Sequence, residues 1–110
     1  MEITKKAMRL NPNPPVWYLS IFGGAYWLAG RHEEAVGTLT RCTDQVPDYI
    51  YCRVKLVLAL VDAGREEEVR VQAKEVLRIN PRFSSADFAD DYTSPTKERV
   101  ATLLERAGLN

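Results

Sequence analysis

The chain repeats itself at a fixed interval of 34 residues. The segment Gly-Arg-His-Glu-Glu at residues 30–34 returns as Gly-Arg-Glu-Glu-Glu at residues 64–68, and Pro47 returns as Pro81. Two different sequence features, a Gly-Arg-x-Glu-Glu segment and a proline, therefore recur at the same spacing. Self-similarity at a period of tens of residues is typical of stacked supersecondary units, each of which needs a neighbour to bury its apolar face. The interval predicts a repeat array, an architecture that usually functions by holding other molecules.

Apolar residues within each unit follow the spacing of a helix. In residues 14–47 two stripes are separated by Gly30: Leu19, Phe22, Tyr26 and Ala29, then Ala35, Val36, Leu39 and Cys42. In residues 48–81 two stripes are separated by Gly64: Tyr51, Leu56, Leu60 and Ala63, then Val69, Ala73, Val76 and Leu77. Glycine is common at the carboxyl end of a helix, and glutamates stabilise the first turn of the helix that follows. Each unit is therefore predicted to be a helix-turn-helix pair.

The two ends of the chain depart from the full repeat. Residues 1–12 are predicted to be the second helix of a partial repeat, and residues 84–110 an irregular segment followed by a capping helix that begins after Ser94-Pro95. The whole of residues 1–110 is expected to be a single all-α domain. The partial repeat would expose Ile3, Ala7 and Leu10 unless another chain or an upstream helix covers them, so these residues are candidates for self-association.

At this point the units resemble the tetratricopeptide repeat, whose pattern places Trp, Leu-Gly, Tyr, Ala, Phe and Pro at set offsets. The first unit matches at Leu19, Phe22-Gly23, Tyr26, Ala35, Leu39 and Pro47. The second is looser, with Arg53, Leu56-Val57, Leu60, Val69, Ala73 and Pro81 at the matching positions. The resemblance implies antiparallel helix pairs stacked as a short right-handed solenoid, in which the first helix of each pair lines a concave groove.

That resemblance also implies where a partner would bind. The residues expected to face the groove are Trp17, Ser20, Ile21, Gly24, Trp27, Leu28, Tyr51, Val54, Lys55, Leu58, Val61 and Asp62. This face is largely apolar and aromatic, which favours a protein or peptide partner, such as a helix or extended peptide laid in the groove. The family's carboxylate clamp is not expected, because only Lys55 supplies a suitable side chain at the matching places. The alternative is that Trp17 and Trp27 simply pack on neighbouring helices.

A narrower resemblance concerns the carboxy-terminal repeat region of bacterial adenylate/guanylate cyclase-like proteins. It is carried by Ala-Met-Arg-Leu-Asn-Pro at residues 7–12, by Pro15, Trp17 and Tyr18, by Gly30-Arg31, and by Leu-Glu-Arg-Ala-Gly-Leu at residues 104–109. It implies a regulatory or scaffolding tail of a larger signalling enzyme, without the cyclase activity itself.

Charge gives no attraction to nucleic acid or to a membrane, because fifteen basic and fifteen acidic residues cancel. Arg70, Lys74, Arg78 and Arg82 recur every four residues and could bind phosphate, but a solvated outer helix face accounts for them better. The partner is therefore expected to be a protein or peptide, or a second copy of this chain.

Catalytic and metal sites are not expected. The chain has one histidine and lacks the phosphate-loop, nucleophile-elbow and H-E-x-x-H motifs, so we predict no enzyme activity, no cofactor and no metal. Cys42 and Cys52 form neither a C-x-x-C pair nor a zinc spacing. We expect a cytoplasmic protein, in which free, mostly buried thiols are favoured over the alternative of a disulfide between Cys42 and Cys52.

Overall fold

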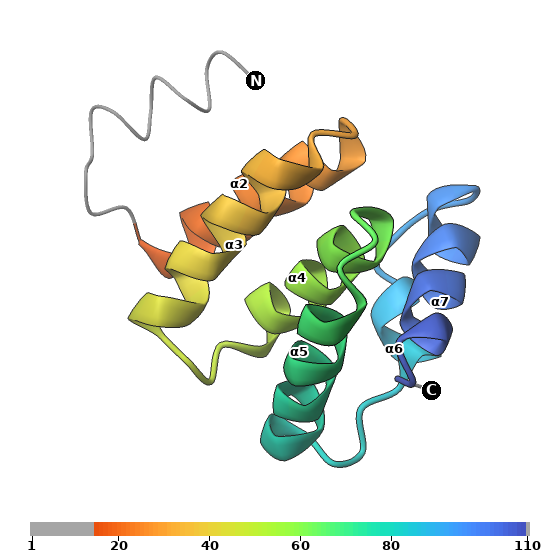
Figure 1. Cartoon of the computed structure of the whole chain (residues 1–110). Coiled ribbons are helices and arrows are strands. Elements are labelled where there is room, and N and C mark those ends of the chain that lie inside the picture. The colour runs from red at the N-terminus through yellow and green to blue at the C-terminus, as the bar shows by residue number, and fades with distance from the viewer. Residues whose placement is uncertain (1–14, 110) are drawn as a thin grey trace.

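The structure is a computed structural model that describes residues 15–109. Within that range the chain forms six helices and no strand. They are α2 (Val16–Leu28), α3 (His32–Gln45), α4 (Ile50–Asp62), α5 (Glu66–Ile79), α6 (Ser85–Ala89) and α7 (Thr96–Arg106). Figure 1 shows α2 and α3 side by side, then α4 and α5, with α6 and α7 at the far end. The all-α prediction is confirmed.

The two hairpins, α2–α3 and α4–α5, have the same turn. In the first, Gly30 has a φ of 76° and Arg31 N–H donates to the carbonyl of Tyr26. In the second, Gly64 has a φ of 73° and Arg65 N–H donates to the carbonyl of Leu60. These contacts close the end of a helix when a glycine adopts the left-handed conformation. The repeated Gly-Arg segment therefore encodes a repeated turn.

Acidic residues begin the second helix of each hairpin. Glu33 and Glu34 lie in the first turn of α3, and three glutamates lie in the first turn of α5. Neither helix has a side-chain hydrogen bond at its N-cap. The attraction between these carboxylates and the positive end of the helix dipole stabilises the start of each helix instead. Arg31 reinforces the turn through an ion pair with Glu34 at 2.5 Å.

The first helices of the two hairpins run parallel. Lys55 contacts Ser20, and Trp27 contacts Asp62, so both contacts join residues 35 positions apart in the same order. Within the first hairpin, Gly23 lets α2 approach α3 closely, because a Cβ on Gly23 would lie 2.4 Å from Leu39. The sequence pattern thus brings α2, α3 and α4 around one buried core.

A disulfide joins Cys42 near the end of α3 to Cys52 in the first turns of α4. The prediction of free thiols is therefore wrong, although both sulfurs are buried as expected. A separation of ten residues looks unremarkable in the sequence. The loop between α3 and α4 reverses the chain over those residues and brings the two side chains together.

After α5 the repeat stops. Ser84 begins α6 by accepting a hydrogen bond from the Asp87 N–H, and α7 follows a turn that contains Ser94-Pro95. The apolar side of α7, including Val100 and Leu104, is buried. Residues 1–12, including the candidate self-association residues Ile3, Ala7 and Leu10, lie outside the described residues.

Candidate binding face on α2 and α4

The structure divides the twelve residues expected to face a groove into three groups. Four are exposed: Trp17, Ile21, Leu28 and Tyr51. Three are partly buried: Lys55, Val61 and Asp62. Five are buried: Ser20, Gly24, Trp27, Val54 and Leu58. The first turns of α2 and α4 are therefore open, whereas most of their later turns are covered.

The open half carries one large aromatic residue from each helix. Trp17 is 50% exposed and Tyr51 is 51% exposed, and the two positions are related by the 34-residue repeat. Ile21 lies one turn after Trp17 and Leu28 two turns later on the same side of α2. We call Trp17, Ile21, Leu28 and Tyr51 the apolar strip. Exposed apolar side chains gathered in this way are typical of an interaction surface.

A cavity of about 250 Å³ adjoins the strip at Tyr51. Apolar side chains from the start of α4 and from the segment around α6 form part of its wall, namely Ile50, Tyr51, Val54, Phe83 and Phe88. The rings of Phe83 and Phe88 lie 6.2 Å apart. Arg82, Asp87 and Asp91 also line this cavity, so both signs of charge are present. It could accept one apolar side chain of a partner.

Lys55 joins the two helices between the open and covered halves. Its Nζ donates to the Ser20 carbonyl at 3.2 Å and to the Ser20 Oγ at 2.9 Å. Burial lowers the pKa of Lys55, and the nearby carboxylate of Asp91 opposes that shift. Because the ammonium is already bound by α2, Lys55 holds the helices together and is not free to clamp a carboxylate.

The covered half is centred on Trp27, which is only 1% exposed. Its indole Nε1 donates to the Asp62 carboxylate at 2.6 Å. Asp62 also pairs with Arg99 of α7, whose guanidinium lies 5.1 Å from the centre of the Trp27 ring. Tyr92 meets the same indole edge-on, with ring centres 6.5 Å apart. His32 adds a further contact, with its Nε2 3.9 Å from Asp62.

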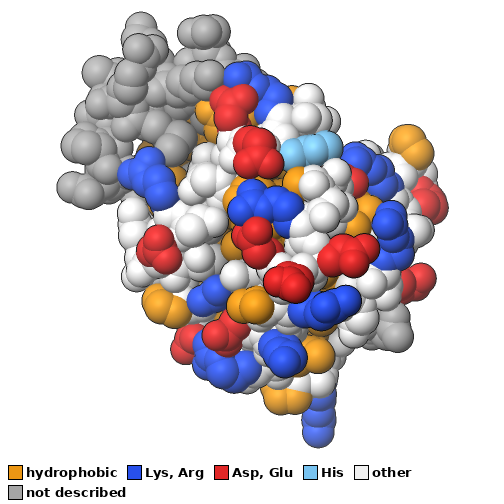
Figure 2. Space-filling view, viewed as in Figure 1, with side chains coloured by type: hydrophobic (Ala, Val, Ile, Leu, Met, Phe, Trp, Pro, Cys, Tyr) orange, Lys and Arg blue, Asp and Glu red, His pale blue; other side chains and the backbone are white. Residues whose placement is uncertain are grey.

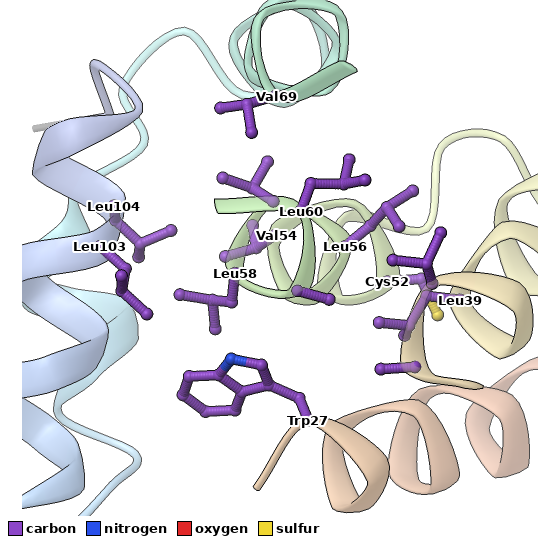
Figure 3. Packing of buried hydrophobic residues seen from close by; sticks show 14 of the residues in the cluster. Trp27, Leu39, Cys52, Val54, Leu56, Leu58, Leu60, Val69, Leu103 and Leu104 are labelled. Atoms are coloured by element: carbon purple, nitrogen blue, oxygen red, sulfur yellow. The ribbon is translucent and has the colours of Figure 1, made fainter. Parts of the chain in front are cut away.

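Leucines of α7 complete the cover. Leu103 and Leu104 point toward α4, and the Trp27 ring lies beside Leu58 (Figure 3). Leu58 and Val54 are both fully buried. In the structure, Trp27 and Leu58 are therefore core residues and cannot contact a partner while α7 stays in place, whereas Val54 is fully buried but lines the cavity beside Tyr51.

Sequence reasoning did not find the Asp62–Arg99 pair or the cover that it secures. One signal was present: Asp62 stands where the repeat places the apolar Leu28 in the first unit. A lone carboxylate among apolar positions needs a partner when it is partly buried. The sequence alone does not say that the partner comes from α7.

The outer surface carries mixed charge. Figure 2 shows acidic and basic side chains interspersed over the face it presents. Of the four basic residues that recur every four positions, Arg82 lies beyond the end of α5, and Arg78 pairs with Asp48 and Glu75, whose carboxylates raise the pKa of Arg78. Arg70, Lys74 and Arg82 are exposed. Across residues 15–109, no helix has the length and apolar character needed to cross a bilayer.

Comparison with known proteins adds no relative. The chain matches no family model, no curated protein and no solved structure.

Proposed function

We propose that this protein is a noncatalytic binding module of the tetratricopeptide type. It would hold a peptide or helix of a protein partner on the open half of the α2–α4 face. Two helical hairpins with equal turns and parallel first helices support the repeat assignment. The apolar strip supports the binding role, and it is the observation that carries the proposal.

The shape and charge of the open half define the partner's chemistry. Trp17 and Tyr51 offer large, rigid apolar surfaces, which are the residue types that dominate binding energy at interfaces. The cavity beside Tyr51 is small enough to suit a single aliphatic or aromatic anchor. The net charge of zero gives no attraction to nucleic acid or to anionic lipid. A peptide with two apolar residues spaced to reach the strip and the cavity fits best.

Two other functions follow from the sequence but gain no support from residues 15–109. Self-association was expected through Ile3, Ala7 and Leu10, which lie outside the described residues. A role as the regulatory tail of a cyclase-like enzyme rests on the sequence resemblance alone. We therefore retain partner binding as the proposed function.

The disulfide bears on the cellular compartment. Disulfides persist mainly in oxidising environments and are rare in the cytosol. The bond between Cys42 and Cys52 thus weighs against the cytoplasmic expectation. Counting free thiols in protein isolated under alkylating conditions decides the matter, because a cytosolic protein of this kind would yield two.

Selection from a random peptide library tests the proposed function. We expect the intact protein to enrich peptides with aromatic or branched aliphatic anchors. The variant Trp17→Ala/Tyr51→Ala should bind these peptides at least about tenfold more weakly, since hot-spot aromatics contribute 2 kcal/mol or more. Val71→Ala is the matched control, because Val71 is 58% exposed but lies on α5 outside the strip.

The outcome that contradicts the proposal is equally clear. Peptides that bind the double variant as well as the intact protein would show that the strip is not the site. Far-UV circular dichroism must first show that the double variant keeps its helices, which is expected because both substituted side chains are half exposed.

A further inference from the structure

A second and larger cavity lies where the end of α7 meets the turn between α4 and α5. Its volume is about 420 Å³, within the range of small-molecule sites. Val61, Val69 and Ala107 supply apolar wall, while Arg70, Arg106 and Glu66 supply the charges. Apart from Val61, none of these residues belongs to the face expected to bind a peptide, so the cavity is a separate feature.

The two arginines of this cavity differ from most others in the protein. The side chains of Arg70 and Arg106 make no hydrogen bond or ion pair with any residue in 15–109. In contrast, side-chain partners occupy the guanidiniums of Arg31, Arg53, Arg65, Arg78 and Arg99. The cavity therefore has two available guanidiniums on separate helices.

The charge balance of the cavity favours an anion. Among the described residues that line the cavity, Glu66 is the single acidic one, against two arginines. Glu66 also lies in the first turn of α5, where the helix dipole stabilises its negative charge. A planar guanidinium binds a carboxylate through two parallel N–H bonds, and Arg70 of α5 and Arg106 of α7 both line this cavity.

We propose that this cavity binds a small organic acid, with a carboxylate held by Arg70 and Arg106 and a short aliphatic chain against Val61, Val69 and Ala107. The combination of unpaired cations with an apolar wall selects an amphipathic anion. A carboxylate without a chain leaves the wall unfilled, and a chain without a carboxylate leaves both arginines unpaired.

Titration with three simple probes tests this chemistry. Amide NMR spectra of the full chain at low salt, where screening is weak, would be followed with hexanoate, 1-hexanol and acetate. We expect hexanoate to shift the amide signals of Gly64 and Gly108, which line the cavity. The other two probes should bind about tenfold more weakly, because each lacks half of the interaction. Equal shifts with 1-hexanol and hexanoate, or no shift with hexanoate, would overturn the proposal.

Charge variants then assign the residues. Arg70→Gln and Arg106→Gln should each weaken hexanoate binding about threefold, and Glu66→Gln should strengthen it by a similar factor, as expected for partly screened charges. Lys74→Gln is the control, because Lys74 is exposed on α5 one turn beyond Arg70 and does not line the cavity. Arginine variants that bind hexanoate as tightly as the intact protein would exclude the site.

Discussion

The two hairpins close with the same turn but fill their interiors in opposite ways. Gly23 on α2 meets Leu39 on α3, so the first hairpin places its small residue on the first helix. The equivalent positions 34 residues later are Val57 on α4 and Ala73 on α5, both buried. The small and large residues have exchanged helices. A close-packed interior constrains the combined volume of its side chains more than their identity. The two hairpins therefore have one small and one large side chain at this helix contact, although the residues differ.

The hairpins also differ in what covers their first helix. Leu28 ends α2 in an exposed position, whereas its equivalent, Asp62, is bound by Trp27 and Arg99. The end of α2 therefore stays exposed as part of the apolar strip, whereas the end of α4 is covered by α7. The same repeat position is thus exposed in one hairpin and covered in the other, depending on its neighbours.

Substitution of Gly23 is expected to have the largest effect. A Cβ there would lie 2.4 Å from two side-chain carbons of Leu39, which is fully buried. Gly23→Val should lower the free energy of unfolding by about 3 kcal/mol through overpacking. Leu39→Ala alone should cost about 3 kcal/mol by leaving a cavity. The double variant recreates the Val57–Ala73 arrangement and should be at least about 2 kcal/mol more stable than additivity predicts.

Urea unfolding of the four proteins measures this coupling. Gly37→Ala is a control for replacing a glycine within a helix, because a Cβ on Gly37 would meet nothing within 4 Å. That change should stabilise the protein by about 0.5–1 kcal/mol. If the effects of Gly23→Val and Leu39→Ala on the free energy of unfolding are strictly additive, the two positions do not compensate for each other in volume, and the prediction is wrong.

Removal of the disulfide between the hairpins should have the next largest effect. The bond closes a short loop between α3 and α4, and no disulfide links α5 to the segment that follows within the described residues. Cys42→Ala/Cys52→Ala should lower the free energy of unfolding by about 2–3 kcal/mol, as the chain-entropy model gives for a loop of this length. Reductant should destabilise the intact protein by a similar amount and leave the variant unchanged. Two reactive thiols in unfolded, unreduced protein would contradict the prediction.

Exchange of the residues that end α2 and α4 tests the second difference. Asp62→Leu leaves the buried Trp27 indole N–H without an acceptor and Arg99 without its partner. We expect a loss of about 2 kcal/mol, the usual cost of an unsatisfied buried donor. The reciprocal change, Leu28→Asp, should cost less than about 0.5 kcal/mol because Leu28 is exposed. Equal effects in urea unfolding would show that α7 does not depend on Asp62.

The repeat made the helices and their turns predictable from the sequence. Glycine at residues 30 and 64, followed by acidic residues, identifies both helix ends before any packing is known. These features depend on local chemistry, which the sequence displays directly.

The covered half of the face was not predictable in the same way. The 34-residue repeat ends after Pro81. The sequence therefore does not show which part of the α2–α4 face is covered by α7. Trp27 looks the same in the sequence whether it binds a partner or Arg99. The Cys42–Cys52 bond was missed for a related reason, because it depends on the path of the loop between hairpins and not on cysteine spacing.

The smallest expected effect tests whether the two turns are equivalent. Gly30 and Gly64 have φ values of 76° and 73°, and a Cβ on either would meet nothing within 4 Å. Gly30→Ala and Gly64→Ala should therefore each cost about 1 kcal/mol from backbone strain alone, and by nearly equal amounts. Asparagine tolerates this conformation better than alanine, so Gly30→Asn and Gly64→Asn should cost less. The two alanine variants could instead differ by more than about 0.5 kcal/mol in their free energy of unfolding, measured in urea. The second turn, which lies against the cavity at the end of α7, would then contribute to stability through its surroundings in a way that the first turn does not.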